Sequence, residues 1–493
     1  MPQKRTRQSA SPSRPSSHSR SAASPSRRSR TSSTPSARRS AERRTRNRAA
    51  GPREVRSVTP RSDAPEGIEV NLPGGHELLL TRRHFLYGAA GVAALALIGG
   101  GGYAYMHATA NSSGDVSTLS VPEGAVFTTE DCAQIEDPST AVSLLSSQDL
   151  AYGTLVWSNN DTNAVCLLPT ETSSPLAQIG VITLSSGTCT TVVEHAVGED
   201  DGFEIYDVRG CENGIVWTEA DILEGVWRVY HATLDGALLG EPVLAEERTS
   251  EWETPTLAAA GDYAFWQILP RTDGPAKSED SLVRRARFGD ASASDVYTSH
   301  GRMACAPYST ENGVVITPRA DTSGTYYQLT HIDAASGQTT DSLVLPSSMR
   351  PFEAGYGSTG FSFAFESIYN YGGGIANLGT YTPAALPGEN LTGSGASGAY
   401  GGASWFRFPR TPSAAPAWCG PWFVVKSTSA VCGVDLANRQ YFSLEVENGA
   451  DDYGEYLAST GSGKRIVTYT NIDHQPLGGE AVKCCRVKVW EAV

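Results

Sequence analysis

A glycine followed by a short apolar or aromatic run recurs seven times in the second two-thirds of this chain. The runs begin at Gly153, Gly214, Gly261, Gly313, Gly360, Gly420 and Gly463, with spacings of 61, 47, 52, 47, 60 and 43 residues. A period near 50 is typical of repeated four-stranded antiparallel sheets with long loops. Long helical periodicity is nearly missing from this region. The repeat therefore predicts an all-β domain over residues 137–493.

The residues around each glycine supply the other strands of the unit. TPTLAAA precedes Gly261 as one such strand. The segment YYQLTHIDAASGQTTDSLVL, which follows Gly313, contains two strands joined by a turn that begins at Asp333 and includes Gly337. Asp and Gly favour such tight reversals. HIDAASGQ resembles the turn of YVTN-type and quinoprotein-type propeller repeats, and the arrangement is similar to TolB-like propellers. We therefore predict a seven-bladed β-propeller, with six blades, eight blades or a pair of β-sandwiches as alternatives.

The last repeat ends one strand short of the four-stranded unit. We expect residues 116–128, within a linker over 108–136, to provide the missing strand and to close the ring. Trp157, Trp217 and Trp266 occupy equivalent positions in successive repeats. This periodicity predicts packing between adjacent blades rather than a binding role.

The chain divides sharply by charge. Residues 1–83 contain 19 of the 39 basic residues and 6 of the 53 acidic ones, so the remainder has 20 basic and 47 acidic residues. Residues 1–80 are rich in Ser, Arg and Pro and poor in large apolar side chains, a composition that predicts disorder. No aromatic residue interleaves the arginine clusters, so we do not expect nucleic acid as a partner.

A membrane-directed segment follows the basic tail at residues 81–107. Residues 85–106 carry no charge, and 22 residues are enough for a helix to cross a bilayer. The positive flank predicts a cytoplasmic N-terminus. Thr81, Arg82, Arg83, Phe85 and Leu86 resemble the twin-arginine signal, which implies export of a folded domain by the twin-arginine translocase. We expect a single-pass protein with an extracytoplasmic propeller, which is secreted if the chain is cleaved after Ala110.

Acidic residues precede several of the expected inner strands. Convergence of these loops at one face would create a ligand face, with Ca²⁺ or a basic partner as candidate ligands. Solvated loop charge is the alternative. The residues are Asp200, Asp201, Glu251, Glu253, Glu353, Asp451 and Asp452. Asn159–Asn163, NNDTN, lacks the rest of a calcium-loop pattern and is interpreted as a polar turn.

The motifs of common enzymes do not occur in the sequence. It has no G-x-S-x-G, Walker loop or H-E-x-x-H. Of nine cysteines, Cys419 and Cys432 are the pair that we expect to form a disulfide. We therefore predict a binding or scaffolding module for a protein or glycan rather than an enzyme. The alternative is a propeller enzyme, glycan-active or quinone-dependent, that uses carboxylates at the channel entrance.

Overall fold

The computed structural model describes residues 68–72, 76–80 and 116–493, with gaps at 173–174, 222, 366–372, 386–399, 401–403, 410–413 and 476–478. Contacts divide the chain into two units, Met1–Ala64 and Pro65–Val493. The predicted tail and the membrane-directed segment at 81–107 lie outside the described residues. In the part that is described, no helix is long and apolar enough to cross a membrane.

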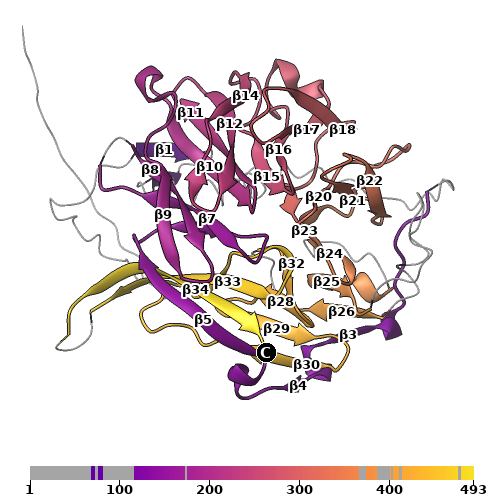
Figure 1. The fold of residues 1–493 in the computed structure, drawn as a ribbon. Helices are drawn as coiled ribbons and strands as arrows, with labels where there is room; N and C mark the ends of the chain where they lie inside the picture. Colours follow the sequence, from indigo (N-terminus) through magenta and orange to yellow (C-terminus); the bar gives the residue numbers. More distant parts are fainter. Residues whose placement is uncertain are drawn as a thin grey trace, which may run out of the picture. The chain divides into compact units, whose positions relative to one another are not determined.

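The described elements are strands and short 3₁₀ turns (Figure 1). Seven sheets contain four or more strands among the described residues, and an additional hairpin joins β1 (Ile68–Leu72) to β2 (His76–Leu80). We number these seven sheets first to seventh in chain order. The prediction of an all-β, propeller-like architecture is confirmed.

The first and third sheets follow the simple meander. The first contains β6 (Leu155–Trp157), β7 (Asn163–Pro169), β8 (Ala177–Thr183) and β9 (Thr188–Val193). The second contains β10 (Glu204–Cys211), β11 (Gly214–Asp221), β12 (Val226–Asp235), β13 (Leu238–Leu239) and β14 (Val243–Arg248). In this second sheet β12 pairs with both β13 and β14. The third contains β15 (Thr256–Ala260), β16 (Tyr263–Ile268), β17 (Ser281–Arg287) and β18 (Ala293–Ser299).

The next three sheets repeat the meander, and two of them gain extra strands. The fourth contains β19 (Tyr308–Ser309), β20 (Gly313–Ile316), β21 (Gln328–Asp333) and β22 (Thr339–Val344). The fifth contains β23 (Pro351–Gly357), β24 (Gly360–Phe365), β25 (Gly379–Pro383), β26 (Trp405–Phe408) and β3 (Val126–Thr128). The sixth contains β27 (Ala417–Cys419), β28 (Trp422–Lys426), β29 (Val431–Asp435), β30 (Gln440–Ser443), β32 (Gly461–Gly463) and β4 (Ala133–Gln134).

The seventh sheet combines the two ends of the domain. Its strands are β31 (Tyr456–Leu457), β33 (Arg465–His474), β34 (Val482–Ala492) and, from the other end, β5 (Val142–Leu150). The last repeat is thus completed by an N-terminal strand, as predicted, but residues 116–128 do not provide it. Those residues include β3, which instead pairs in parallel with β26 of the fifth sheet.

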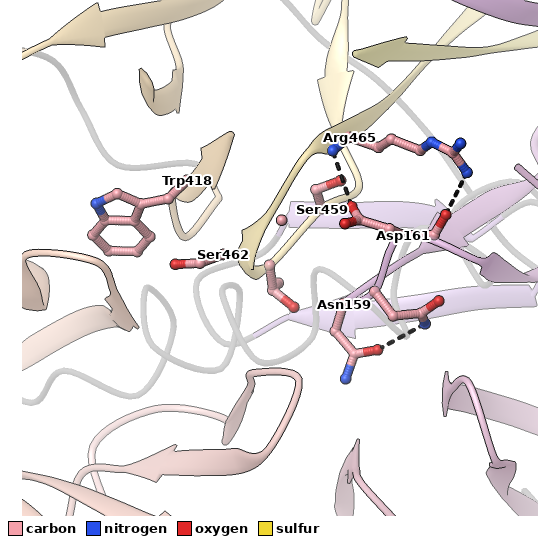
Figure 2. A pocket seen from close by; sticks show the side chains of 9 residues that line it. Asn159, Asp161, Trp418, Ser459, Ser462 and Arg465 are labelled. Carbon is pink, nitrogen blue, oxygen red and sulfur yellow. Dashed lines mark hydrogen bonds between the residues drawn. The ribbon is translucent and has the colours of Figure 1, made fainter. Parts of the chain in front are cut away.

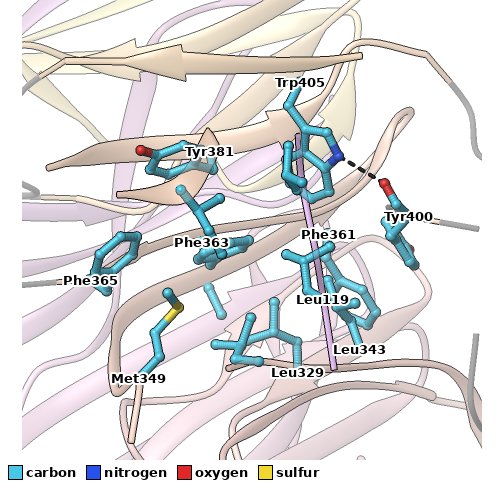
Figure 3. Packing of buried hydrophobic residues seen from close by; sticks show 14 of the residues in the cluster. Leu119, Leu329, Leu343, Met349, Phe361, Phe363, Phe365, Tyr381, Tyr400 and Trp405 are labelled. Carbon is cyan, nitrogen blue, oxygen red and sulfur yellow. Dashed lines mark hydrogen bonds between the residues drawn. The ribbon is translucent and has the colours of Figure 1, made fainter. Parts of the chain in front are cut away.

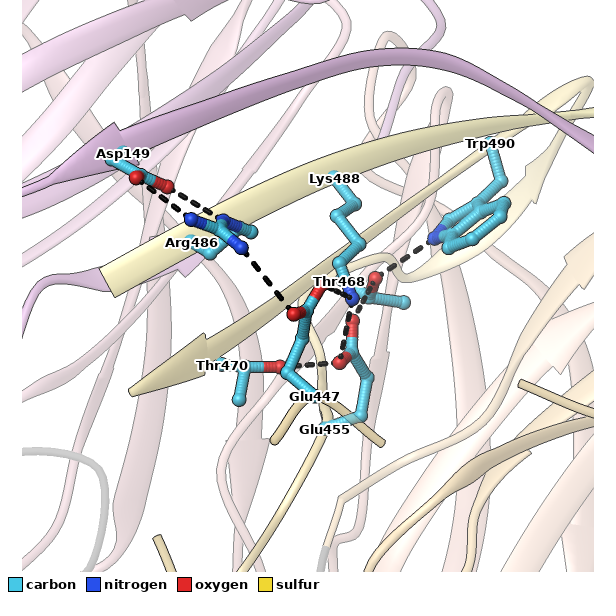
Figure 4. A network of polar contacts seen from close by, with 8 residues as sticks. All are labelled: Asp149, Glu447, Glu455, Thr468, Thr470, Arg486, Lys488 and Trp490. Carbon is cyan, nitrogen blue, oxygen red and sulfur yellow. Dashed lines mark hydrogen bonds and ion pairs between the residues drawn. The ribbon is translucent and has the colours of Figure 1, made fainter. Parts of the chain in front are cut away.

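Polar contacts reinforce this closure (Figure 4). Both carboxylate oxygens of Asp149 on β5 accept from Arg486 on β34, at 2.7 and 2.9 Å. Arg486 also donates to Glu447 at 3.3 Å. The Lys488 ammonium group lies 3.0 Å from the Glu447 carboxylate and 3.3 Å from the carboxylate of the fully buried Glu455. The Asp149–Arg486 pair is bidentate and charge-assisted. Such pairs are geometrically specific, so this one fixes the register of β5 on β34 as well as adding stability.

Apolar clusters join each sheet to the next around the domain. Leu155 of the first sheet packs in one cluster with Trp217 of the second, and Val216 of the second packs with Trp266 of the third. The same holds between later neighbours, ending with a cluster that joins Val467 of the seventh sheet to Val156 of the first. Burial of Trp217 and Trp266, both 0 % exposed, confirms their predicted packing role, whereas Trp157 is partly buried and lies on the first strand of its sheet rather than the second.

The segment before β5 follows the outer strands of successive sheets. Leu119 packs among Leu343, Phe361 and Trp405, between the fourth and fifth sheets (Figure 3). Then β3 pairs with β26 and β4 pairs with β30, both in parallel. Added strands of this kind cover edges that would otherwise expose unpaired backbone groups.

The seven glycines do not all have the same structural position. Gly214, Gly313 and Gly360 begin the second strands of their sheets, as the repeat predicts. Gly153 instead precedes β6, which is the first strand of the first sheet. The strand before Gly153, β5, belongs to the seventh sheet. The glycine of the first repeat therefore precedes the first strand of its sheet rather than the second.

Candidate functional site

A narrow pocket lies where the loop after β6 meets the segment before β33 (Figure 2). Two chain segments that are remote in sequence form most of its wall, and the sixth sheet adds an indole. The lining residues are Asn159, Asn160, Asp161, Trp418, Ser459, Thr460, Ser462, Gly463 and Arg465. We call this site the Asn159 pocket.

Backbone pairing holds the two segments together. Ser158 forms a parallel bridge with Ser459, and Thr460 N–H donates to the Ser158 carbonyl at 2.8 Å. The Asp161 carboxylate accepts from the backbone N–H groups of Lys464 at 2.9 Å and Arg465 at 3.0 Å. Arg465 Nη1 donates to the Asp161 carbonyl at 2.5 Å. Asp161 and Arg465 are therefore fixed beside each other in the wall of the pocket.

Asn159 connects sheets that are distant around the domain. Its Nδ2 donates to the carbonyls of Ala259 at 2.7 Å and Thr310 at 3.1 Å, which belong to the third and fourth sheets. Tyr308 makes a second such connection, because its hydroxyl donates to Pro416 at 2.7 Å and accepts from Gly461 N–H at 2.5 Å. These bonds cross the centre of the ring at the C-terminal ends of the inner strands.

Trp418 supplies the apolar part of the wall. It is 2 % exposed, and its Nε1 donates to Thr359 Oγ1 at 3.3 Å. A Cβ atom at Gly357 would lie 2.2 Å from the indole ring, so only glycine allows this close approach. The indole is thus held rigidly between the fifth and sixth sheets.

The predicted acidic residues lie at the opposite ends of the inner strands. Asp200 and Asp201 belong to the 3₁₀ turn Glu199–Asp201 before β10, and Glu251 and Glu253 precede β15. Asp451 and Asp452 precede β31, whereas Glu353 lies within β23 and is 8 % exposed.

Four of these carboxylates have a local partner, which is an arginine for two of them and a hydroxyl group for the other two. Asp201 lies 3.2 Å from Arg228, and Glu253 lies 2.7 Å from Arg302. Glu353 accepts from Thr380 Oγ1 at 3.0 Å, and Asp451 accepts from Tyr456 at 3.1 Å. Among the described residues, no group of three or more His, Cys, Asp or Glu side chains could hold a metal ion. The geometry therefore does not support Ca²⁺ at this face.

The expected disulfide between Cys419 and Cys432 is not formed. β28 separates the two strands that carry these residues. Cys419 Sγ lies near the Lys464 carbonyl at 3.1 Å, and Cys432 Sγ contacts Ser443 Oγ at 3.6 Å. The two residues also belong to different core clusters. Their separation of thirteen residues placed them on alternate strands rather than on neighbouring ones.

The Asn159 pocket could not be recognised as a site from the sequence. Its one local signal is NNDTN, which we interpreted as a polar turn, and the turn does exist: Asn160 Oδ1 accepts from Thr162 N–H at 2.8 Å. The residues that complete the pocket lie about 300 positions later in the chain. Only the closure of the ring brings them together.

Comparison with known proteins identifies no family for this chain. No family model and no curated protein matches it. Solved structures with a propeller domain do resemble it. A puromycin hydrolase is 12% identical with a TM-score of 0.40, over 73% of this chain and 53% of that one. A prolyl endopeptidase is 10% identical with a TM-score of 0.40, over 70% of this chain and 46% of that one. An oligogalacturonate lyase from Vibrio parahaemolyticus is 8% identical with a TM-score of 0.37, over 70% of this chain and 97% of that one.

The chain thus spans about half the length of the hydrolase and the endopeptidase. All three proteins are enzymes by name. None of these solved structures is a binding or scaffolding module by name, so they lend no support to our prediction of one.

Proposed function

We propose that this protein is a glycan-active enzyme that binds its substrate in the Asn159 pocket of a seven-bladed propeller. Each of the seven sheets is counted as one blade. The observation that supports the proposal is the composition of the pocket wall: amide, hydroxyl, carboxylate and guanidinium groups beside a buried indole. The pocket has a volume of about 10 Å³, which is room for one small polar group rather than a sugar ring, so the glycan would lie across its entrance and place one hydroxyl or carboxylate group among these side chains.

The carboxylate content of the pocket restricts the chemistry. Hydrolysis of a glycoside ordinarily requires two carboxylates about 5 to 9.5 Å apart. Asp161 is the only carboxylate that lines this pocket among the described residues. One carboxylate beside one guanidinium suits an elimination from a uronic acid residue better than hydrolysis. Asp161 would take the proton from the carbon next to the substrate carboxylate while Arg465 stabilises the charge that develops there.

Elimination has a product that can be measured directly. As the proton leaves, a carbon–carbon double bond forms next to the substrate carboxylate, the carbon–oxygen bond to the departing sugar breaks, and that oxygen takes a proton from water, so the unsaturated product absorbs in the ultraviolet. The full chain should release this product from uronic acid oligosaccharides and not from neutral ones. Asp161→Asn should lower the rate roughly 10²-fold or more.

A matched control variant distinguishes a loss of catalysis from a loss of folding. Asp262, an exposed aspartate in the turn between β15 and β16, lies at the same ends of the inner strands but outside the pocket. Asp262→Asn should leave the rate unchanged, and melting curves should show that both variants are folded. If neither oligosaccharide is bound or turned over by the folded protein, the proposal of a glycan-active enzyme is wrong.

We also propose where the enzyme acts. Thr81, Arg82, Arg83, Phe85 and Leu86 support export by the twin-arginine translocase, with the propeller on the extracytoplasmic side of the cell membrane. Residues 81–107 would keep it at the membrane, and cleavage after Ala110 would release it. The substrate would then be a glycan outside the cytoplasm.

A further inference from the structure

A second, larger pocket lies between the first and second sheets. Its volume is about 200 Å³, which is room for on the order of a dozen water-sized groups and therefore for one sugar ring. Its walls are the ends of strands and the turns between them, and among these is the turn between β10 and β11. The lining residues are Thr162, Asn163, Thr183, Glu212, Asn213, Leu234, Asp235 and Gly236. We call this site the Asn163 pocket.

The polar turn after β6 connects the Asn163 pocket to the Asn159 pocket. Asp161 lines the Asn159 pocket, whereas the next two residues, Thr162 and Asn163, line the Asn163 pocket. Asn160, in the wall of the first pocket, donates from Nδ2 to Asn163 Oδ1 at 3.2 Å. One short turn therefore separates the two pockets, and neighbouring residues of one glycan chain can reach both.

The amide of Asn163 provides a hydrogen-bond donor that the protein leaves unused. Asn160 Oδ1 accepts from the backbone N–H groups of Thr162 at 2.8 Å and Asn163 at 2.9 Å, so the other atom of that amide is the donor Nδ2. This donor fixes Asn163 Oδ1 as an acceptor. Asn163 is 3 % exposed, and its Nδ2 has no hydrogen-bond partner among the described residues. Because buried donors are nearly always paired, this one indicates a ligand oxygen.

The charge of the Asn163 pocket restricts the ligand further. Glu212 and Asp235 both line it, and Glu212 Oε1 accepts from Thr162 Oγ1 at 3.1 Å. Neither carboxylate forms an ion pair with a described residue, and the described lining contains no lysine or arginine. The pocket thus attracts a cationic group and repels a carboxylate. Since the described residues contain no cluster of metal-ligating side chains, an organic cation is favoured over a metal ion.

We propose that the Asn163 pocket binds an amino sugar residue. The ammonium group of the sugar pairs with the carboxylates of Glu212 and Asp235, and a sugar oxygen accepts from Asn163 Nδ2. This inference rests on the proposed glycan substrate and narrows its class. The glycan joins a uronic acid residue, read in the Asn159 pocket, to a sugar with a free amino group.

Binding of simple glycosides by the full chain tests this assignment. Methyl glucosaminide, with its free amine protonated, and methyl glucoside are titrated and followed by saturation-transfer NMR. The glucosaminide should bind at least about tenfold more tightly, because its ammonium group faces two carboxylates. An excess of methyl glucuronide should not displace it. Equal affinities for the glucosaminide and the glucoside, or displacement by the glucuronide, would overturn the proposal.

A matched pair of variants locates the bound sugar. Glu212→Gln keeps the shape of the side chain but removes its charge, and it should weaken glucosaminide binding roughly fivefold or more. The control is Glu311→Gln, because the sequence Glu-Asn-Gly precedes or begins the second strand in both the second and the fourth sheets. Both glutamates are exposed, so both variants should fold, which melting curves check. If the two variants bind the glucosaminide alike, the sugar does not lie in the Asn163 pocket.

Asp161→Asn distinguishes this inference from the proposed elimination. That variant should lose turnover and still bind the glucosaminide. A chain that binds the glucosaminide through Glu212 but does not turn over uronic acid oligosaccharides would contradict the elimination alone. A chain that turns these oligosaccharides over but does not bind the glucosaminide would contradict the amino sugar site alone.

Discussion

The imidazole of His331 shows how a single side chain can link pH to stability. It stacks on Tyr356 with ring centroids 4.3 Å apart, and its Nδ1 lies 2.6 Å from Thr340 Oγ1. Burial lowers the pKa of His331 to about 4, although the nearby Asp333 opposes the shift. The folded protein therefore keeps this histidine neutral at pH values where the unfolded chain protonates it.

The sign of the resulting pH dependence follows from this difference. Unfolded histidine titrates near pH 6.5, so stability should be complete above that value and decrease as the pH falls toward 4, by on the order of 2 kcal/mol. Urea unfolding at several pH values should show this loss. His331→Gln should flatten the curve over this range, and the exposed His300→Gln should not change it. If the free energy of unfolding of His331→Gln falls with pH as steeply as that of the unchanged protein, the proposed link between His331 and stability is wrong.

Individual residues were the least predictable level from sequence. The acidic residues do flank inner strands, but Arg228 on β12 pairs with Asp201 and Arg302 in the loop before β19 pairs with Glu253, and the repeat pattern does not reveal those partners. The Asn159 pocket depends on contacts across the ring. Side chains hundreds of positions apart meet only after the register of every sheet is fixed.

At the level of elements, β5 is the unexpected closing strand. Its sequence, VSLLSSQDL, contains five serine, glutamine or aspartate residues and resembles a loop more than a strand. We expected residues 116–128 instead, because this segment precedes the repeats and the last repeat is one strand short, but Leu119 and Val121 pack between the fourth and fifth sheets. The strand count of the repeat thus predicted that an N-terminal strand closes the ring, and tertiary packing decided which one.

Deleting either segment distinguishes their roles. Removal of residues 142–150 should lower the melting temperature and cause aggregation, because β34 would become an unpaired edge and the Asp149–Arg486 bonds would be lost. Removal of residues 116–128 should lower the melting temperature less and leave the protein monomeric. Calorimetry and size-exclusion chromatography provide the two readouts. If the two deletions behave alike, β5 has no special role in closure.

At the level of the whole molecule, the glycine repeat was the most reliable guide. It predicted an all-β, propeller-like domain, because a repeated sheet has one physical solution that removes most of its edges. It could not predict that the first repeat is shifted by one strand, since the displaced β5 leaves no mark in the spacing. The basic tail and the twin-arginine resemblance concern residues beyond those that the structure describes.

The export proposal is tested on the intact chain. Changing Arg82 and Arg83 to lysine conserves charge but removes the guanidinium pair that the signal resembles. The propeller should then remain in the cytoplasm, as followed by cell fractionation and by protease protection. Changing Arg43 and Arg44 to lysine in the basic tail is the control and should leave export intact. Normal delivery of the Arg82/Arg83 variant would exclude the twin-arginine route.

The shared seventh sheet has a consequence for the timing of synthesis. Asp149 and its partner Arg486 are 337 residues apart. At about 5 to 20 residues per second, a ribosome takes roughly 17 to 67 s to make the chain between them. Throughout that interval β5 has been made but the strand it pairs with has not. The ring cannot close before β34 has been made, so an exporter that accepts only folded cargo, as we propose for this protein, would have to wait for that strand although the export signal precedes both strands in the chain.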